Sequence, residues 1–494
     1  MSEISTSNLC EIKRPCDPCA IVLFGASGDL TIKKLMPALY GLFINNYLPN
    51  SFYIIGCARS EFNDDSFRDR VRASLENISL RMEGKIDEFL ERLYYRQISY
   101  ADPSSYETLA GRMELLDKEN SIPANRLFYL AVPPNLYNDI SEMLGSSGLS
   151  VEKGKKNNWT RIVVEKPFGR DLESAKVLDG SLKKSFKEDQ IYRIDHYLAK
   201  ETVQNILFFR FANTIFEPLW NSQYIEYVEI LAAEKIGIEK RAGYYENAGI
   251  IRDMFQNHMM QLLSLIAKEP PSKFTSEIIR DEKAKLFNSL RPFDVNDKNN
   301  ELVLAQYKEG VIDGEKVCSY RDEQGVDPSS LTPTYASFKM FVDNHRWKGV
   351  PFYMRAGKRL DQKMTRIIVQ FKDLKHSIFN NVICSDLNAN RLTFYIQPIE
   401  KISLSFETKK PGSSFCVSTQ NMEFVPDGNG QHLEAYEKVI LDCLNGEQML
   451  FLRQDAEELC WSYFTGFIND CATCFDPQKN LKFYQGGTSP NNIK

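Results

Sequence analysis

Short apolar runs alternate with helical patterns along residues 20–190. The runs are AIVLF at 20–24, FYIIG at 52–56, RLFYLAV at 126–132 and RIVV at 161–164. Between them, segments such as 33–43 place apolar side chains three or four positions apart, as amphipathic helices do. Strands buried on both faces lack polar alternation, so this order predicts a doubly wound, mostly parallel sheet covered by helices.

The pattern changes in the second half of the chain. Residues 224–233 predict a strand, 243–249 a loop and 250–263 a long apolar helix, and helical patterns return near 432–445 and 454–470. Consecutive strands without helices between them favour a large, mainly antiparallel sheet. They are expected at 335–342, 353–356, 365–371, 391–397 and 401–406. The last residues, GGTSPNNIK, are expected to fray.

Composition narrows the class of protein. Of the 494 residues, 43% are hydrophobic and 26% are charged, which is typical of a globular protein of two or three domains. The net charge of −5 disfavours a nucleic-acid partner, yet a local basic pocket could still bind a small anion. No apolar run is long enough to span a membrane, and the first residues lack the apolar region of a secretory signal. We therefore expect a cytoplasmic protein with no membrane partner.

The 11 cysteines include two C-x-x-C pairs, Cys16 with Cys19 and Cys471 with Cys474. Four thiolates could hold zinc. The two pairs lie at opposite ends of the sequence, so reduced thiols are the favoured interpretation and no metal is expected.

A glycine turn follows the first apolar run. Gly25 and Gly28 lie between that run and the next helical pattern, an order that directs backbone N–H groups and a helix N-terminus at a phosphate. The G-x-x-G spacing departs from G-x-G-x-x-G, with Thr31 where a third small residue is common, and a tight strand-to-helix turn without a ligand stays an alternative. Arg59, beside Ser60, follows the second run and favours the 2′-phosphate of NADP, unless it is an ordinary surface arginine.

Two later segments reach the same edge of the sheet. Tyr137 follows the third run and is close enough to contact a coenzyme, and Lys166 follows the fourth run in EKPFG. We therefore divide the chain into a flexible leader at 1–19, a Rossmann-like NADP-binding domain at 20–190 and an α+β domain for substrate and dimerisation at 191–494.

The stretch RIDHYLAKE, residues 193–201, places several ionisable side chains close to the boundary between the two predicted domains. Asp195 is expected to cap a helix, which would place His196 and Lys200 on one helix face that suits an anion such as a phosphate. The alternative is a capped helix start with solvated side chains. His258 lies in an apolar helix, where a buried core histidine is an equally good interpretation. Asp253 is five positions earlier and would not share its face.

These motifs identify the chain as similar to one enzyme family. GASGDL, ARS, NRLFYLAVPP, RIVVEKPFGRDL, IYRIDHYLAKE, GIIRDMFQNH, IRDEKAK and GVPFYMRAGK occur in the order and spacing of glucose-6-phosphate dehydrogenase, and the resemblance covers nearly the whole chain. It implies oxidation of the C1 hydroxyl of glucose 6-phosphate to 6-phosphogluconolactone with hydride transfer to NADP, the first step of the oxidative pentose phosphate pathway. It also implies a homodimer or homotetramer.

The resemblance also implies a role for each site residue. His258 is the general base, and Asp195 orients it. The implied substrate-binding residues are Lys166, His196, Tyr197, Lys200, Glu234, Asp253, Lys358, Lys363 and Gln397. The implied coenzyme-binding residues are Gly25, Ala26, Ser27, Gly28, Asp29, Leu30, Arg59, Tyr137 and Lys166.

Departures from the family pattern carry their own prediction. Ala199 replaces the usual glycine of H-Y-L-G-K, and a methyl group should be tolerated there. Some relatives bind a second, structural NADP through basic residues in the C-terminal domain. Because those positions here are Met364, Tyr395, Ser405 and Thr488, we expect this second site to be absent or much weakened.

Two other functions agree less well with the sequence. Sugar oxidoreductases of other Rossmann families also end a strand in Glu-Lys-Pro, but they generally lack an Asp-His-Tyr-x-x-Lys cluster. An inactive NADP-binding sensor is disfavoured because a base, its carboxylate and cations for a phosphate are all present.

Overall fold

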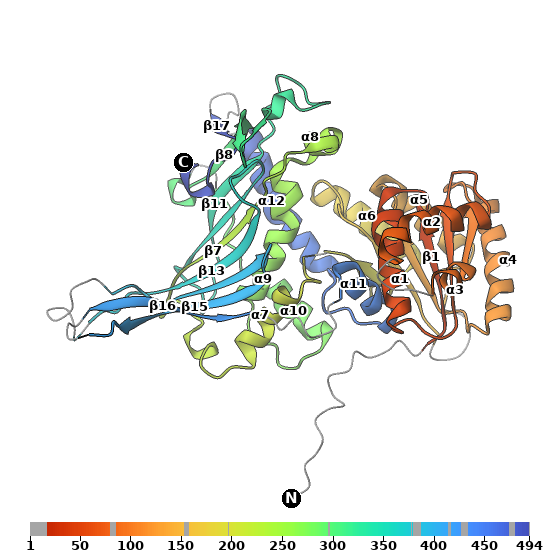
Figure 1. Cartoon of the computed structure of the whole chain (residues 1–494), viewed down its shortest axis with the longest axis horizontal. Coiled ribbons are helices and arrows are strands. Elements are labelled where there is room, and N and C mark those ends of the chain that lie inside the picture. Colours follow the sequence, from red (N-terminus) through yellow and green to blue (C-terminus); the bar gives the residue numbers. More distant parts are fainter. Residues whose placement is uncertain are drawn as a thin grey trace, which may run out of the picture.

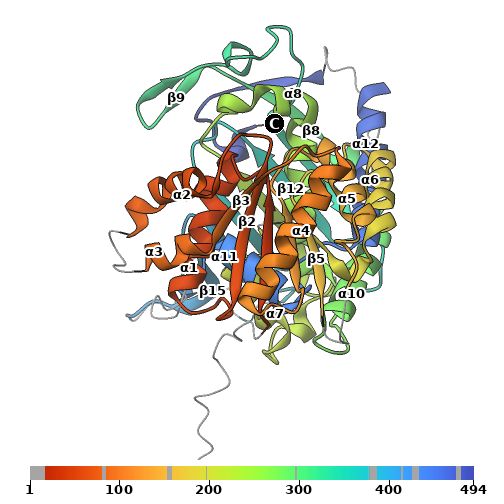
Figure 2. The same ribbon diagram turned by 90° about the vertical axis from the view of Figure 1, so that its right-hand side faces the viewer.

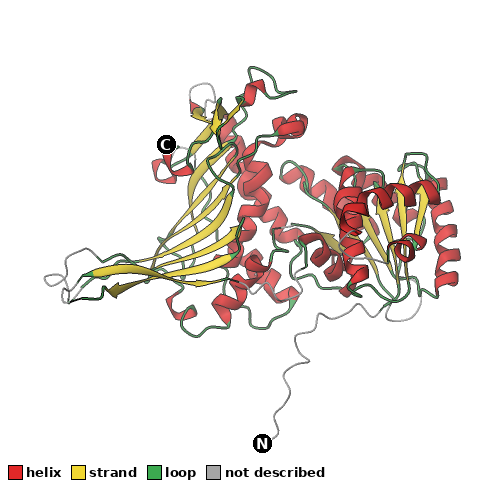
Figure 3. Cartoon of the chain, viewed as in Figure 1, coloured by secondary structure: helices red, strands yellow, loops and turns green. Residues whose placement is uncertain are grey.

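A computed structural model describes residues 17–79, 85–152, 158–195, 197–294, 297–376, 378, 387–412, 416–425, 433–473 and 480–493. Two sheets lie side by side along the molecule, with helices packed between and around them (Figures 1 and 3). One sheet belongs to the N-terminal half and the other to the C-terminal half, which confirms the predicted α/β plus α+β class.

The N-terminal sheet is six-stranded and parallel, in the order β3-β2-β1-β4-β5-β6. This is the strand order of a dinucleotide-binding fold, in which ligands bind where the order reverses beside β1. Alternate residues of β1 enter separate cores on the two faces of the sheet. The strands are β1 (Cys19–Phe24), β2 (Phe52–Ala58), β3 (Leu93–Gln97), β4 (Arg126–Leu130), β5 (Thr160–Val164) and β6 (Ile191–Arg193).

Helices cover both faces of this sheet, as the apolar runs predicted (Figure 2). A π-helical turn at Thr31–Leu35 leads into α1. On one face lie α1 (Met36–Ile44), α2 (Asp64–Ser79) and α3 (Ile86–Glu91), and on the other α4 (Pro103–Asn120), α5 (Tyr137–Ser146) and α6 (Leu172–Ser185).

The C-terminal sheet is nine-stranded, in the order β16-β15-β14-β13-β7-β12-β11-β8-β17. Its pairings are antiparallel except β7 with β12 and β8 with β17. The strands are β7 (Ile225–Ala233), β8 (Val303–Lys308), β11 (Tyr335–Phe341), β12 (Pro351–Gly357), β13 (Met364–Phe371), β14 (Arg391–Gln397), β15 (Lys401–Lys409), β16 (Val417–Phe424) and β17 (Lys482–Gln485), and β9 (Gly310–Ile312) pairs with β10 (Glu315–Val317).

Helices fill the space between the C-terminal sheet and the N-terminal domain (Figure 1). One of them, α11, packs against α1 in the core of the N-terminal domain, so residues near the C-terminal end of the chain contribute to that core. The division at residues 190 and 191 stays a prediction. The helices are α7 (Glu201–Phe211), α8 (Ala242–Ile250), α9 (Met260–Ala267), α10 (Ser276–Asn288), α11 (Ala435–Asn445) and α12 (Gln454–Thr473), with a π-helix at Ile251–Met259.

Three local predictions were wrong. No helix starts at Asp195, because its carboxylate accepts the N–H of Tyr197 at 3.0 Å in a turn, and α7 begins at Glu201. Residues 243–249 are not a loop but most of α8, which bends at Gly249 (φ 58°). The tail is not frayed up to residue 493, since the N–H of Gly487 donates to Arg359 O at 2.8 Å and Tyr335 donates to Pro490 O at 3.2 Å.

Candidate active site

A cavity of about 580 Å³ opens at the carboxyl ends of β1, β2 and β4, where a dinucleotide-binding fold holds its ligand. The glycine turn forms one wall, and the segments after β2 and β4 form the others. The residues that line this coenzyme cavity are Gly25, Ser27, Gly28, Ala58, Arg59, Ser60, Tyr100, Ala131, Val132, Pro133 and Leu136.

Close backbone packing explains the glycines of the turn. Gly25 has φ +85°, and a Cβ there would lie 2.1 Å from Ala131 O. The N–H of Gly28 donates to Gly25 O at 2.9 Å, and the buried hydroxyl of Thr31 donates to the same oxygen at 3.0 Å. Thr31, the departure from the usual glycine pattern, therefore braces the turn.

The second strand brings Arg59 and Ser60 to the same cavity. The hydroxyl of Ser60 donates to Ser27 Oγ at 3.0 Å, and Tyr95 donates to Ser60 O at 2.6 Å. Ser27 of the turn and Ser60 after β2 thus form one polar corner, with the exposed guanidinium of Arg59 beside it.

Five of the predicted coenzyme residues do not line this cavity, and one of them, Lys166, lines a second cavity instead. Ala26 is buried beneath the turn, Leu30 is half-buried, and Asp29 is exposed and pairs with Lys33 at 2.9 Å. Tyr137 is fully buried, and its hydroxyl donates to Glu165 O at 2.9 Å. Tyr100 and Leu136 line the cavity instead, and no motif in the sequence marked them.

A second cavity, of about 380 Å³, lies between the two domains and holds nearly every predicted substrate residue. Asp195 lies behind its wall, and His196 is outside the described residues. The predicted residues that line this sugar cavity are Lys166, Tyr197, Lys200, Glu234, Asp253, His258, Lys358, Lys363 and Gln397. Sequence reasoning missed Lys235, Ile236, Arg241 and Met254. Nη2 of Arg241 lies 3.8 Å from Asp253 Oδ1.

A buried carboxylate–imidazole pair forms the floor of the sugar cavity. Nδ1 of His258 lies 2.6 Å from Asp195 Oδ1, and only 2% of His258 is exposed. The ring of Tyr197 stacks on the imidazole with centroids 4.1 Å apart and planes 23° apart. Lys166 Nζ lies 2.5 Å from Nε2, on the side that faces the cavity.

The π-helix explains how Asp253 and His258 reach one cavity. In an α-helix of 3.6 residues per turn, residues five apart point to different faces, which is why the sequence separated them. A π-helix bonds residue i to i+5 and so brings such residues close to the same face. Both residues contact one ammonium, since Lys166 Nζ also donates to Asp253 O at 3.2 Å.

Burial lowers the pKa of His258 below its usual 6.5. The carboxylate of Asp195 opposes this shift, and the charge of Lys166 adds to it. Burial also lowers the pKa of Lys166, against the attraction of Asp253. The imidazole is therefore neutral at neutral pH, with Nδ1–H donated to Asp195 and the Nε2 lone pair available as a base.

Two carboxylates on the cavity wall can accept hydrogen bonds from sugar hydroxyls. Lys358 Nζ lies 2.5 Å from Glu234 Oε2 and 3.4 Å from Asp253 Oδ2. Burial alone would raise the pKa of Asp253, but the cations of Lys166, Lys358 and Arg241 hold it below its usual value. Asp253 is therefore ionised and remains an acceptor.

A cationic corner lies at the start of α7. Lys200 donates to Gln397 Oε1 at 2.6 Å, and Gln397 in turn donates to Thr365 Oγ1 at 2.7 Å. Burial lowers the pKa of Lys200, Glu400 opposes that shift, and the charge of Lys363 adds to it. Two ammonium groups beside a helix N-terminus suit a phosphate.

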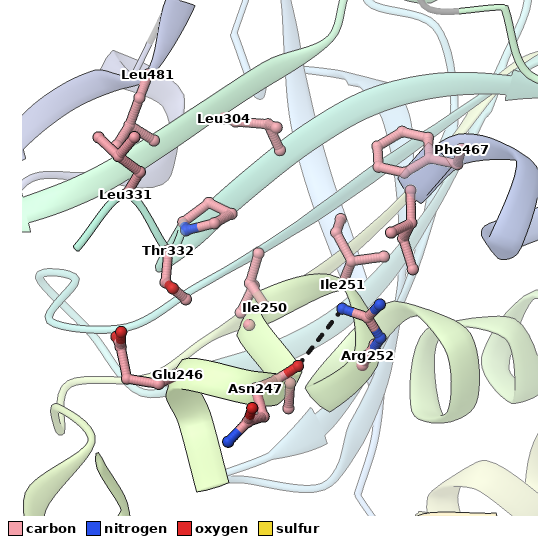
Figure 4. Close-up of a pocket in the computed structure, with 14 residues that line it drawn as sticks. Glu246, Asn247, Ile250, Ile251, Arg252, Leu304, Leu331, Thr332, Phe467 and Leu481 are labelled. Atoms are coloured by element: carbon pink, nitrogen blue, oxygen red, sulfur yellow. Dashed lines mark hydrogen bonds between the residues drawn. The ribbon is translucent and has the colours of Figure 1, made fainter. Parts of the chain in front are cut away.

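A third cavity, of about 210 Å³, lies behind the bend at Gly249 (Figure 4). Ile250, Ile251, Leu304 and Phe467 project into it, and Arg252 and Glu246 stand at its side. Its mainly apolar lining does not suit a sugar phosphate.

Two features are absent from the part of the chain that the structure describes. No three histidine, cysteine, aspartate or glutamate side chains gather there as a metal site would require. None of the helices found there is both long and apolar enough to cross a membrane.

Comparison with known proteins places both halves of the chain in one family. Residues 22–205 match the family model described as glucose-6-phosphate dehydrogenase, NAD binding domain, and residues 207–493 match the C-terminal domain of the same enzyme. Glucose-6-phosphate 1-dehydrogenase of Aggregatibacter actinomycetemcomitans is 44% identical over 91% of this chain and 90% of its own, and that of Bacillus subtilis is 42% identical over 90% and 89%.

Solved structures agree with the sequence matches. A glucose-6-phosphate dehydrogenase in complex with its substrate glucose-6-phosphate is 36% identical, with a TM-score of 0.88 over 97% of this chain and 96% of its own. The enzyme from Mycobacterium avium is 30% identical, with a TM-score of 0.79 over 95% of each chain. The chain therefore belongs to the glucose-6-phosphate dehydrogenase family.

Proposed function

We propose that the protein is a glucose-6-phosphate 1-dehydrogenase that oxidises C1 of glucose 6-phosphate to 6-phosphogluconolactone and reduces NADP. The observation that carries this proposal is the buried His258–Asp195 pair, which opens onto a cavity with carboxylates at one side and the ammonium groups of Lys200 and Lys363 at the other. Family membership supports the same activity, because the matched relatives carry that enzyme's name.

His258 is the general base of the proposed mechanism. Nε2 takes the proton of the C1 hydroxyl while the C1–H bond breaks and its electron pair leaves as hydride, so that C1 becomes the lactone carbonyl. Bound NADP supplies the hydride acceptor. Asp195 orients the ring through Nδ1 and stabilises the imidazolium that forms. Lys166, which contacts Nε2 in the structure, must give way to the hydroxyl.

The remaining residues of the sugar cavity bind and orient. Lys200, Lys363, Tyr197 and His196 are proposed to hold the phosphate, and Gln397 fixes the ammonium of Lys200. Glu234, Asp253 and Lys358 are proposed to bind the hydroxyls. The phosphate is remote from C1, so its binding energy orients the substrate for the reaction.

The coenzyme cavity is proposed to hold NADP, and its residues fit such a molecule. Gly25 and Gly28 let the backbone approach a pyrophosphate, and Arg59 with Ser27 and Ser60 provides donors for a 2′-phosphate. Ala26, Asp29, Leu30 and Tyr137 complete the set as residues that shape the turn and the wall.

Assembly, location and domain division are part of the same proposal. Exposed Phe406, Met422 and Phe424 on β15 and β16 support self-association as a homodimer or homotetramer. Free thiols at Cys57, Cys318 and other described positions are compatible with the reducing cytoplasm. The boundary at residues 190 and 191 separates the Rossmann-like domain from the substrate domain.

The proposed function can be tested with purified protein. Formation of NADPH from NADP, and of NADH from NAD, is measured with glucose 6-phosphate, with other hexose phosphates and with free glucose. We expect the highest kcat/KM with glucose 6-phosphate and NADP, and Lys200→Ala should raise KM for the sugar phosphate far more than it lowers kcat. Nucleotide binding without turnover of glucose 6-phosphate would contradict the proposal.

A further inference from the structure

Arg70 lies on α2 beside the polar corner of the coenzyme cavity. Its Nη2 donates to Ser27 O at 3.2 Å, and its guanidinium carbon lies 5.8 Å from the centre of the Phe62 ring. Ser27 and Ser60 line the cavity there, so these two contacts hold the guanidinium at the cavity edge.

Two neighbouring arginines on α2 form ion pairs, whereas Arg70 forms none with the described residues. On the same helix, Arg68 pairs with Asp65 at 3.3 Å and Arg72 pairs with Asp87 at 2.6 Å. Among the residues that the structure describes, no carboxylate lies within ion-pair distance of Arg70 or of Arg59 in the cavity. The nearby carboxylate of Asp29 is already paired with Lys33 at 2.9 Å.

The guanidinium groups of Arg59 and Arg70 and the hydroxyls of Ser27 and Ser60 lie around one corner, and the charge of Arg70 is only partly offset by the nearby Asp29. Such a set of donors suits a highly charged anion. A phosphate monoester carries about −1.5 to −2 charges at pH 7, so one arginine does not neutralise it. An arginine has five N–H donors in a planar fork, and Arg70 spends one of them on Ser27 O.

We propose that Arg70 is a second specificity-determining residue, whose guanidinium binds the 2′-phosphate of NADP together with Arg59 and the hydroxyls of Ser27 and Ser60. This inference rests on the proposed function, since it takes NADP as the coenzyme. It predicts that Arg70 discriminates between nucleotides with and without a 2′-phosphate and contributes little to binding the rest of the coenzyme.

Calorimetry with 2′,5′-ADP and 5′-AMP tests this directly in the full-length protein. Arg70→Gln should weaken binding of 2′,5′-ADP about five- to tenfold, the effect of a partly exposed charge-assisted contact. Binding of 5′-AMP should stay within about twofold, since it lacks the 2′-phosphate. The matched control is Arg72→Gln, which removes an exposed arginine from the same helix and should change neither affinity.

Arg59→Gln distinguishes failure of this inference from failure of the proposed coenzyme. If Arg59→Gln weakens only 2′,5′-ADP and Arg70→Gln changes neither affinity, Arg70 has no role and the inference is overturned. Equal weakening of both nucleotides by Arg70→Gln would also overturn it, because Arg70 would then only shape the turn at Ser27. If neither variant affects 2′,5′-ADP, the 2′-phosphate lies elsewhere and the NADP assignment of this corner fails with it. No sugar phosphate is present, so the outcome does not depend on dehydrogenase activity.

Discussion

His258 lies between opposite charges, with the carboxylate of Asp195 at Nδ1 and the ammonium of Lys166 near Nε2. A base acts only while it is unprotonated, so kcat/KM should fall as the pH falls through the pKa of this histidine. Burial and Lys166 hold that pKa below 6.5. The acidic limb of the pH profile should therefore lie below pH 6.5.

Replacing Lys166 with glutamine tests this electrostatic balance. Loss of the nearby positive charge should raise the pKa of His258, so the acidic limb of kcat/KM should move to higher pH. The control is Lys235→Gln, which removes another lysine of the same cavity whose ammonium pairs with Asp313 at 2.7 Å. A limb that stays in place or moves to lower pH in Lys166→Gln would show that this ammonium does not control the base.

At the scale of elements, a buried hydrogen bond connects the π-helix to α12. The side-chain amide of Gln256 donates to Glu457 Oε1 at 2.7 Å, and both side chains are buried. Burial raises the pKa of Glu457 from its usual 4.5 to about 8, with Gln256 opposing the shift and the nearby carboxylate of Asp179 adding to it. Glu457 is therefore neutral, and it accepts the hydrogen bond of Gln256 without placing a negative charge near Asp195.

The pH dependence of stability tests the protonation of Glu457. The unfolded chain releases this proton near pH 4.5 and the folded chain near pH 8, so this group's contribution to stability is lost as the pH rises through that window. The variant Glu457→Gln cannot ionise at this position. In urea unfolding, its free energy of unfolding should therefore rise relative to that of the wild type between about pH 5 and about pH 8.

Glu457→Ala serves as the contrasting variant. It leaves the buried amide of Gln256 without a partner and should lose about 1–3 kcal/mol or more at either pH. A stability difference between Glu457→Gln and the wild type that does not change with pH would mean that Glu457 is ionised.

Much of each element, but not its local detail, could be predicted from sequence. The apolar runs at 20–24 and 52–56 were predicted as buried strands and form β1 and β2, and the motifs around Lys166 and His258 named residues that meet in one cavity. The π-helical hydrogen bonding could not be predicted, because the apolar spacing of this segment also fits an ordinary α-helix.

Partners from distant elements were equally beyond local reasoning. Glu457 is 201 positions from Gln256, and Thr365 reaches Gln397 only because β13 pairs with β14. In the sequence, nothing distinguishes Arg70 from a solvent-exposed arginine on a helix. Its contact with the glycine turn depends on the packing of α2. Asp195 also matched a helix cap, but its carboxylate is shared between Tyr197 and the distant His258.

At the scale of the whole molecule, the described part of the large C-terminal sheet contains a groove that could be considered for a second nucleotide. A groove of about 350 Å³ on β13–β16 is lined by Tyr395 and Ser405, with Arg366 and Arg391 beside them. Arg366 pairs with Glu229 at 3.3 Å, and Arg391 donates to Gln370 at 2.7 Å. The charge of Arg366 is therefore neutralised by a carboxylate, and the guanidinium of Arg391 is held against a neutral amide, which leaves one unpaired cation in the described part of this groove, where several would be needed for a nucleotide.

Nucleotide titration of the intact protein should therefore give one NADP per chain. Equilibrium dialysis followed by release and quantification of bound nucleotide measures this stoichiometry, with Arg59→Gln as the variant that should weaken the single site. Two tightly bound equivalents per chain, one of them unaffected by Arg59→Gln, would show that the second site is present.

The central claim is that His258 removes the proton of the C1 hydroxyl of glucose 6-phosphate. Replacing it with asparagine keeps a polar side chain of similar size but removes the base, so steady-state kinetics of His258→Asn against the wild type is the most direct test. We expect kcat to fall about 10²–10⁴-fold, the usual contribution of a general base, with KM changed by less than about threefold. A kcat within about tenfold of the wild type would contradict the account.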